Sequence, residues 1–209
     1  KQRLAGEPVQ YITGTAAFRH LELQVDRSVL VPRPETEVLV DVVLKLLGLR
    51  HSPWVLDMGC GSGAVGISVA QELLSARVLA VDISSKAVRV TKNNADRNHV
   101  AGRLHAVGGD LFDCLSLTAA ASQFDLIISN PPYVATSEIA NLPEEIRKEP
   151  PVALDGGADG LDFYRRLSHE APQFMASRGA LVLEVGDGQS QAVLQILRDC
   201  GRLENLTCC

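Results

Sequence analysis

Four consecutive residues, Asn130-Pro131-Pro132-Tyr133, combine the groups needed to hold a planar NH2 group. They follow an apolar stretch, 124–129, which we expect to be a buried strand. Each proline fixes φ and lacks an N–H donor, so carbonyl oxygens remain free as acceptors. The Asn130 side-chain oxygen and the Pro131 carbonyl could accept both hydrogens of the amino group, and Tyr133 could stack on its π face. The motif therefore predicts substrate-binding and catalytic residues that act at an amide or exocyclic amine nitrogen.

An amide nitrogen is a poor nucleophile because its lone pair is delocalised into the carbonyl group. Positioning can supply ~7–11 kcal/mol of a barrier, and a preorganised hydrogen bond ~3–4 kcal/mol. In methyl transfer from a sulfonium donor to such a nitrogen, the methyl group is already activated, so no strong general base is needed. None of the five histidines lies near a motif, and we nominate no catalytic histidine. No nucleophile elbow of a hydrolase is present either.

A glycine-rich segment, Gly59-Cys60-Gly61-Ser62-Gly63, follows a second apolar run, 53–58. Its glycines allow a tight turn and close approach of a ligand, and the helix that follows offers free N–H groups. Residues 61–66 also match the dinucleotide fingerprint G-x-G-x-x-G. However, Asp57 just before the loop would repel a pyrophosphate. A carboxylate there suits an ammonium or sulfonium ligand such as S-adenosylmethionine, so we place Asp57 and all five loop residues in a cofactor site.

Two further strand ends extend the predicted cofactor site. Asp82 ends the apolar run 77–82 and could accept hydrogen bonds from both ribose hydroxyls, in NAD and in S-adenosylmethionine alike; we include its neighbour Ile83. Asp110 and Leu111 follow the run 103–107. Asp110 could accept an adenine amino hydrogen, and Leu111 could pack on the ring. Asn130, at the adjacent strand end, completes the cofactor-binding set, and we expect no metal ligand.

The elements that must position these residues alternate along the chain. We predict strands at 53–58, 77–82, 103–107, 124–129 and 179–185, and helices at 64–74 and 84–98, the latter capped by Ser84. Apolar strands that alternate with helices predict an α/β, Rossmann-like, doubly wound and mostly parallel sheet with helices on both faces. An amphipathic helix at 35–47 and a β-hairpin within 6–31 precede it. The long irregular stretch 131–151 is typical of a functional loop.

Composition sets the outer limits. The 209 residues are 46% hydrophobic and 22% charged, typical of one globular domain. The net charge of −5 and the lack of a basic run speak against a broad nucleic-acid surface. Five cysteines without a CxxC pair argue against a disulfide framework or a zinc site, and for a reducing compartment. We also expect no membrane span.

Taken together, the motifs resemble those of the HemK/PrmC family of class I methyltransferases, the release factor glutamine methyltransferases. The NPPY residues alone are shared with nucleic-acid methyltransferases, and their combination with flanking motifs is much more specific. The matching segments are Gly6-Glu7-Pro8, Gln10-Tyr11, Gly14, Val31-Pro32-Arg33-Pro34-Glu35-Thr36-Glu37, the run from Leu56 to Gly63, Asn130 to Tyr133, Glu149-Pro150-Pro151-Val152-Ala153-Leu154, Gly156-Gly157 and Gly160.

The resemblance implies transfer of a methyl group from S-adenosylmethionine to the glutamine side-chain amide in the GGQ motif of release factors. The products would be N5-methylglutamine and S-adenosylhomocysteine. It assigns the cofactor loop to Gly59, Gly61 and Gly63, the ribose to Asp82, the adenine neighbourhood to Leu111, and the glutamine to the four residues from Asn130 to Tyr133. Arg33 and Glu35 would lie near the cleft, with a structural role as plausible as a substrate-binding one.

The resemblance also implies partners and a place in the cell. Release factors would bind through their GGQ loop, with no stable nucleic-acid partner and no membrane, and we expect a monomer. A bacterial-type member would be cytoplasmic; because the sequence begins at Lys1, a mitochondrial protein that has lost a targeting segment fits as well.

The chain departs from the family in two respects. We expect residues 1–34 to form a hairpin and linker segment and 35–209 the methyltransferase domain, with the family's N-terminal helical docking domain absent. The family sheet ends in an antiparallel strand pair, and 203–209 is long enough for only one of those strands.

Three alternatives remain. An NPPY-type nucleic-acid amino-methyltransferase would act on adenine or guanine and would need a basic groove and a base-flipping pocket. A non-catalytic S-adenosylmethionine-binding module would not need paired amide acceptors. An NAD-dependent dehydrogenase is disfavoured by Asp57.

Overall fold

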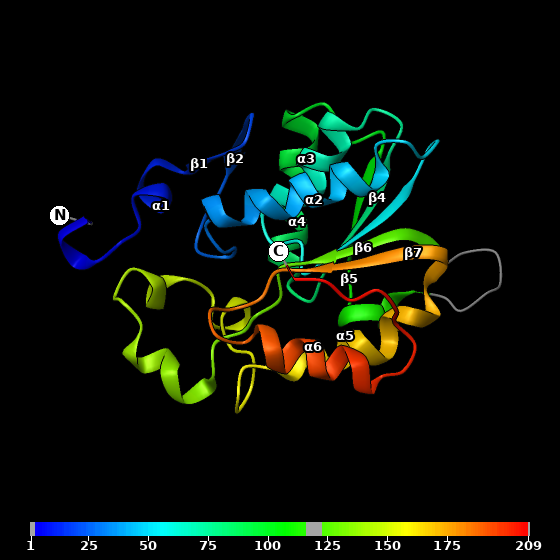
Figure 1. Cartoon of the computed structure of the whole chain (residues 1–209). Coiled ribbons are helices and arrows are strands. Elements are labelled where there is room, and N and C mark those ends of the chain that lie inside the picture. The colour runs from blue at the N-terminus through cyan, green and yellow to red at the C-terminus, as the bar shows by residue number, and fades with distance from the viewer. Residues whose placement is uncertain (1–2, 116–122, 209) are drawn as a thin grey trace.

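A five-stranded parallel sheet forms the centre of the computed structural model, which describes residues 3–115 and 123–208 (Figure 1). The strands run in the spatial order β5-β4-β3-β6-β7. Their bounds are Trp54–Met58 (β3), Arg77–Asp82 (β4), Leu104–Gly108 (β5), Phe124–Ser129 (β6) and Met175–Leu183 (β7). Chain order reverses between β3 and β6, and the carboxyl ends of strands at such a reversal bound the usual ligand crevice of an open α/β sheet.

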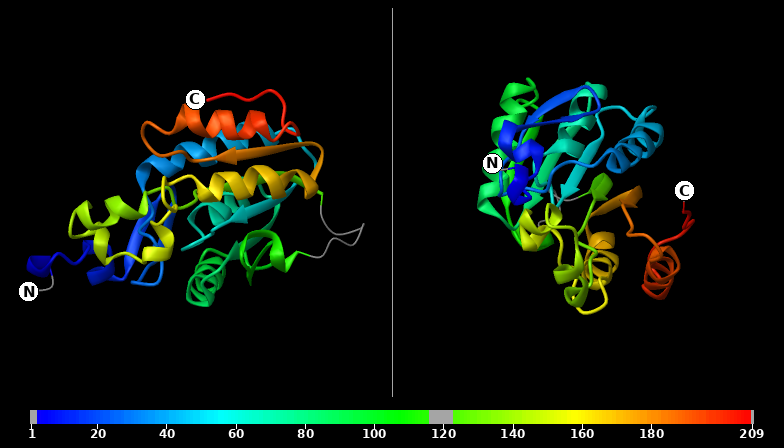
Figure 2. Two further views of the ribbon diagram at one scale, coloured as in Figure 1. Left: turned by 90° about the horizontal axis from the view of Figure 1, so that it is seen from below. Right: turned by 90° about the vertical axis from the view of Figure 1, so that its left-hand side faces the viewer.

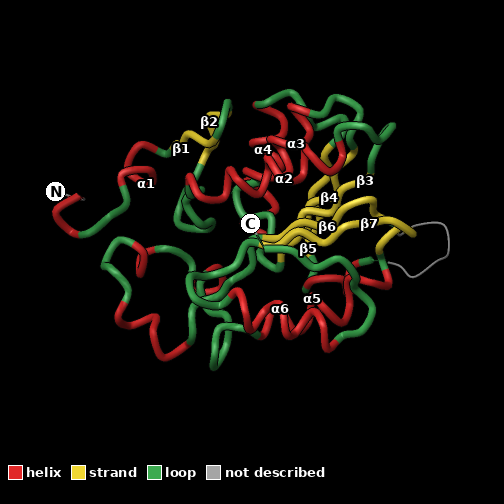
Figure 3. The backbone as a smooth tube through the Cα atoms, viewed as in Figure 1, coloured by secondary structure: helices red, strands yellow, loops and turns green. Residues whose placement is uncertain are grey.

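Helices cover both faces of this sheet, as the sequence predicts. In Figure 3, α2, α3 and α4 lie above the yellow strands, and α5 and α6 lie below them. The helix bounds are Glu37–Leu47 (α2), Ala64–Glu72 (α3), Ser85–Arg97 (α4), Asp162–Glu170 (α5) and Ser190–Asp199 (α6). One apolar cluster fills the upper layer and a second, which includes Leu56, Ile127 and Leu167, fills the lower layer. Because both faces are buried, the central strands are mostly apolar.

Local signals place the helix starts beside the strand ends. Ser84 caps α4, since its Oγ accepts a hydrogen bond from the Ala87 N–H at 3.2 Å. Gly63 precedes α3 with φ of +83°, a left-handed conformation that glycine adopts without strain. A Cβ at Gly63 would also lie 2.8 Å from Ile67 and 2.9 Å from Thr91. The turn after β3 therefore requires this glycine for both conformation and space.

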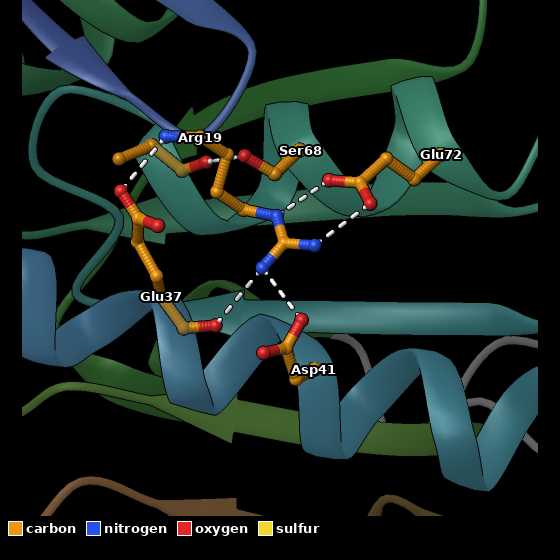
Figure 4. Close-up of polar contacts among 6 residues, drawn as sticks. Arg19, Glu37, Asp41, Ser68 and Glu72 are labelled. Carbon is orange, nitrogen blue, oxygen red and sulfur yellow. Dashed lines mark hydrogen bonds and ion pairs between the residues drawn. The ribbon is translucent and has the colours of Figure 1, made fainter.

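A two-stranded antiparallel hairpin, β1 (Thr15–Phe18) and β2 (Leu21–Gln24), packs against the upper helices. Arg19 in its turn makes a bidentate ion pair with Glu72 of α3, at 2.6 and 2.8 Å, and contacts Asp41 of α2 at 2.6 Å (Figure 4). Its backbone N–H also donates to Glu37 at 2.9 Å. With its side chain only 13% exposed, Arg19 fixes the hairpin to two helices at once.

The N-terminal residues lie beside the long loop that follows β6. Figure 2 shows the blue N-terminal segment next to the yellow-green segment around residue 145. Arg3 forms an ion pair with Glu145, which joins these distant parts of the sequence. The loop itself contains three short 3-10 helices, Thr136–Asn141, Ile146–Lys148 and Pro151–Ala153.

Several predicted boundaries were wrong. Residues Val9–Thr13 form a short helix, α1, inside the segment 6–31 where we expected a β-hairpin. Gly14 ends it at φ of +77°, and the prediction failed because the β-branched residues of this segment, Val9, Ile12 and Thr13, favour strands. The last strand, β7, begins four residues before the predicted start at 179 and ends at Leu183. Residues 203–208 form no strand, and Cys209 lies outside the described residues.

Candidate functional site

A cavity lies at the carboxyl ends of β3, β4 and β6, where the strand order reverses. Its wall comes from the glycine loop, two strand ends, the start of the NPPY motif, the segment after the hairpin and the loop before α5. The lining residues are Ser28, Val29, Leu30, Met58, Gly59, Gly61, Val81, Asp82, Ile83, Ser84, Ala87, Gly109, Asp110, Leu111, Asn130, Pro132, Pro150, Val152, Ala153 and Phe163. Most of this wall is apolar, with carboxylates at two strand ends.

The glycine loop exposes its backbone to this cavity. Gly59 and Gly61 have φ of +74° and +55°, and a Cβ built on either residue meets no atom within 4 Å. The Gly59 N–H donates to the Val81 carbonyl at 2.8 Å, and the Gly61 N–H donates to Asp82 Oδ2 at 2.8 Å. The loop is thus tied to β4, and a ligand can pass within contact distance of its main chain.

The Asp82 carboxylate is held in place by two hydrogen bonds and still borders the cavity. Its Oδ1 accepts from the Ser84 N–H at 2.9 Å, and its Oδ2 accepts from Gly61. Burial raises the pKa of the carboxyl, and these two hydrogen bonds oppose that shift. Each ionised oxygen keeps acceptor capacity for a ligand hydroxyl. Ile83 lies at the same wall and is 59% exposed.

Asp57 does not reach the cavity wall. Its carboxyl is buried, and Oδ2 accepts a hydrogen bond from the Gly66 N–H of α3 at 2.9 Å. Burial raises its pKa to about 7. A Cβ on Gly66 would lie 2.7 Å from the same oxygen. This hydrogen bond joins β3 to the first turn of α3.

The other three residues of the glycine loop, Cys60, Ser62 and Gly63, are not part of the cavity lining. Cys60 Sγ is 3.3 Å from Thr91 Oγ1, and burial raises the pKa of its thiol. The Ser62 carbonyl accepts from Asn94 Nδ2 at 2.8 Å. These contacts with Thr91 and Asn94 join the loop to α4.

Asp110 and Leu111 form the wall at the end of β5. Leu111 is buried and adopts φ of +50°, which is uncommon outside glycine. Asp110 pairs with Arg166 of α5 at 2.7 Å. Phe163, also on α5, adds an aromatic side chain to the same cavity, which the sequence analysis did not single out.

The NPPY residues divide between the cavity and its surroundings. Asn130 and Pro132 line it, whereas Pro131 is buried and Tyr133 is half-buried outside the wall. Asn130 Nδ2 donates to Thr36 Oγ1 at 3.1 Å. The Tyr133 carbonyl accepts from Gln189 Nε2 at 2.9 Å, and burial raises the pKa of the Tyr133 phenol.

Arg33 and Glu35 also lie off the cavity wall. Arg33 Nη2 pairs with Glu149 Oε2 at 2.6 Å, and Glu35 is exposed. The Arg33 contact is structural, because it joins the segment before α2 to the loop that supplies Pro150 and Val152.

Sequence reasoning missed two polar residues that adjoin Asn130. Thr36 lies within the PRPETE segment, and Glu184 lies near the end of the last predicted strand, 179–185. A polar residue at the carboxyl end of a buried parallel strand was the available signal, since such ends meet at one edge of the sheet.

Among residues 3–115 and 123–208, no cluster of three or more His, Cys, Asp or Glu side chains is arranged to hold a metal ion. None of the helices within these ranges has the length and apolarity needed to cross a membrane.

Comparison with known proteins agrees with this geometry. Residues 34–157 match the family model of the methyltransferase small domain. The chain is 41% identical to a release factor glutamine methyltransferase of Moorella thermoacetica, over 98% of this chain and 71% of that protein. It is also 41% identical to the release factor glutamine methyltransferase of Geobacter sulfurreducens, over 96% of this chain and 68% of that protein.

Solved structures share the fold. A methyltransferase from Pyrococcus furiosus superposes with a TM-score of 0.62 at 21% identity, covering 92% of this chain and 81% of that one. The hMettl16 catalytic domain in complex with MAT2A 3'UTR hairpin 6 gives 0.69 at 19% identity, over 86% of this chain and 66% of that one.

The parallel sheet, the glycine loop and the family-model match together define a methyltransferase of the Rossmann-like class. Within that class, the two relatives decide the family. The chain belongs to the release factor glutamine methyltransferases.

Proposed function

We propose that this protein transfers the methyl group of S-adenosylmethionine to the side-chain amide nitrogen of the glutamine in the GGQ motif of release factors. The observation that carries the proposal is that Asn130 lines the same cavity as Gly59, Gly61 and Asp82. An amide acceptor and a cofactor-type loop are therefore adjacent at the reversal of strand order. The names of the relatives supply the substrate class.

The cavity wall fits the cofactor. The open space over Gly59 and Gly61 admits a ligand against the main chain, and the Asp82 carboxyl can accept from vicinal hydroxyls. Leu111 and Phe163 offer apolar surface for an aromatic ring. When bound, S-adenosylmethionine supplies a sulfonium-activated methyl group.

The chain's own residues hold the acceptor. Asn130 Oδ1 and the Pro131 carbonyl accept the two amide hydrogens and orient the nitrogen lone pair toward the donor. These contacts gain strength as positive charge develops on the nitrogen, which is when an acceptor accelerates the reaction. The methylated nitrogen then releases one proton to water, and the neutral thioether S-adenosylhomocysteine leaves. Tyr133 packs beside the acceptor, and the Gln189 contact to its carbonyl fixes the motif's backbone. Residues 1–34 form the flanking hairpin segment, and 35–209 the catalytic domain.

The test offers substrates of both candidate classes to the purified chain with methyl-labelled S-adenosylmethionine. A release factor, the same factor with its GGQ glutamine replaced by alanine, and single-stranded DNA and RNA are incubated in parallel. The proposal predicts label on the intact release factor alone. Label on nucleic acid but not on release factor would assign the NPPY motif to an exocyclic amine instead.

The Asn130→Ala variant provides the matched control for the chemistry. We expect it to lose transfer while its affinity for the cofactor changes little, because one acceptor is removed and the wall around Gly59 and Asp82 is intact. Unchanged turnover in this variant would remove Asn130 from the reaction.

A further inference from the structure

The side-chain amide of Asn130 has an oxygen end and a nitrogen end, and only the oxygen can accept a hydrogen bond from the substrate. Its Oδ1 accepts, whereas its Nδ2 donates. If the group rotated by 180° about its terminal bond, Nδ2 would point toward the substrate amide and repel its N–H groups. The proposed function therefore needs an agent that selects one orientation.

Glu184 is placed beside Asn130 by the register of the sheet. Ser129 of β6 pairs with Leu183 of β7, and the Glu184 N–H donates to the Ser129 carbonyl at 3.0 Å. Asn130 follows directly after β6, and Glu184 follows directly after β7. The Tyr164 hydroxyl donates to the Glu184 carbonyl at 3.0 Å, so the Glu184 main chain is held from both sides.

The two side chains also share a face. Two residues earlier on each strand, Ile128 belongs to the apolar cluster beneath α2 and Val182 packs against that cluster. Because strand side chains alternate between faces, Asn130 and Glu184 extend toward that same side. Thr36, buried at the start of α2, lies there and accepts from Asn130 Nδ2 at 3.1 Å.

A carboxylate in this place discriminates between the two orientations. Glu184 Oε2 is buried and has no hydrogen-bond partner among the residues that the structure describes. An ionised carboxylate only accepts hydrogen bonds, so it favours donors such as Nδ2 and the Thr36 hydroxyl and repels Oδ1. Thr36 can accept from Nδ2 while it donates its own proton toward Glu184.

We propose that Glu184 and Thr36 are positioning residues that fix the Asn130 amide with Nδ2 inward and Oδ1 toward the substrate. This inference rests on the proposed function for its consequence, but the orientation itself is a property of the free protein. Neither residue touches substrate, and both act through Asn130.

The orientation is measured first, without turnover. In the 15N-labelled chain the Asn130 side-chain NH2 resonances are assigned by their absence in Asn130→Asp. We expect slow exchange of these protons with water in the wild type and in Thr36→Ser, which keeps the hydroxyl. Thr36→Val and Glu184→Leu should each speed that exchange at least 10-fold. Equal exchange in wild type, Thr36→Val and Glu184→Leu would overturn the inference whatever the substrate.

The kinetic arm uses a double-mutant cycle on methyl transfer. Thr36→Val and Glu184→Leu are expected to lower kcat about 10- to 100-fold, the range for outer contacts that orient a functional side chain, with an unchanged Kd for S-adenosylmethionine. Single-turnover assays at high enzyme concentration measure the residual transfer of Asn130→Ala, and in that background the same changes should have no further effect, because their target is gone.

Additive losses in that background would show that the two residues act elsewhere and would overturn the inference. If Glu184→Leu does not fold, the near-isosteric Thr36→Val is compared with Thr36→Ser, which keeps the hydroxyl. This pair then decides both the exchange measurement and the kinetic measurement. A wild-type chain that labels no release factor would contradict the proposed function alone, since the exchange measurement still decides the orientation.

Discussion

Arg33 Nη2 lies 2.6 Å from Glu149 Oε2, and the Glu149 side chain is only 1% exposed. The same carboxylate accepts from the Val31 N–H at 3.3 Å. This pair joins the segment before α2 to the loop that contains Pro150 and Val152, and both segments contribute to the cavity wall. A buried charge held in this way depends on its partner, because an isolated carboxylate in the interior is costly.

Replacing Arg33 with methionine should therefore destabilise the fold. We expect a loss of about 3 kcal/mol in the free energy of unfolding, since Glu149 would keep its burial and lose its ion pair. Urea titration measures the loss. The double variant Arg33→Met/Glu149→Met should recover part of it, and a double variant less stable than Arg33→Met would contradict the account.

Gly61→Ala should weaken cofactor binding beyond its cost in stability. At φ of +55° a Cβ adds about 1–2 kcal/mol of backbone strain, and here it would project into the cavity. Gly201 is the matched control, with φ of +66° and open space at its Cβ but no place in the cavity wall. Calorimetric titration should show at least 10-fold weaker S-adenosylmethionine binding for Gly61→Ala and wild-type affinity for Gly201→Ala. Equal affinities would mean that the ligand does not pass over Gly61.

Asp82→Asn should lower the affinity for S-adenosylmethionine. A hydrogen bond to a charged group contributes about 1.5–3 kcal/mol, so we expect a loss of roughly 10- to 100-fold in Kd. Asp96→Asn, an exposed acid on α4, serves as the control for the same chemical change. An unaltered Kd in Asp82→Asn would refute the role of Asp82 at the ribose.

The pH dependence of stability should report on Asp57. Its pKa is about 7 in the folded protein and ~3.9 in an unfolded chain. Between these values the folded state holds more protons, so the free energy of unfolding falls as pH rises from about 4 to about 7. The stability contributed by the protonated carboxyl is complete below pH 4 and lost above pH 7.

Asp57→Asn removes this titration. At about 1.4 kcal/mol per pKa unit, wild type should lose a few kcal/mol relative to Asp57→Asn as the pH increases across that window. Urea unfolding of both proteins at pH 5, 6, 7 and 8 measures the difference. A difference that is constant with pH would show that Asp57 is ionised in the fold, with an unshifted pKa.

The sequence predicted the strands of the sheet well because each has a distinctive composition. The runs ending at Met58 and Asp82 are mostly apolar, which is typical of strands buried on both faces. The glycine loop and the NPPY motif could be placed at strand ends for the same reason. Helices α5 and α6 were missed because they mix apolar and polar residues over only nine and ten positions.

Contacts between segments that are distant in the sequence could not be predicted from the motifs. The Asp57 carboxyl accepts a hydrogen bond from Gly66 of α3 in the buried turn that follows β3. Sequence spacing alone does not distinguish this contact from a contact to a ligand. Thr36 approaches Asn130 across 94 positions of sequence, and Glu184 approaches it only through strand register. Such pairs are determined by tertiary packing.

Peptide mapping of the methylated product is the most direct test of the central claim. A release factor incubated with the chain and methyl-labelled S-adenosylmethionine is digested and sequenced by mass spectrometry. The account predicts one labelled side-chain amide, on the GGQ glutamine, and far less label with Asn130→Ala. Label on any other residue, or equal label with Asn130→Ala, would contradict it.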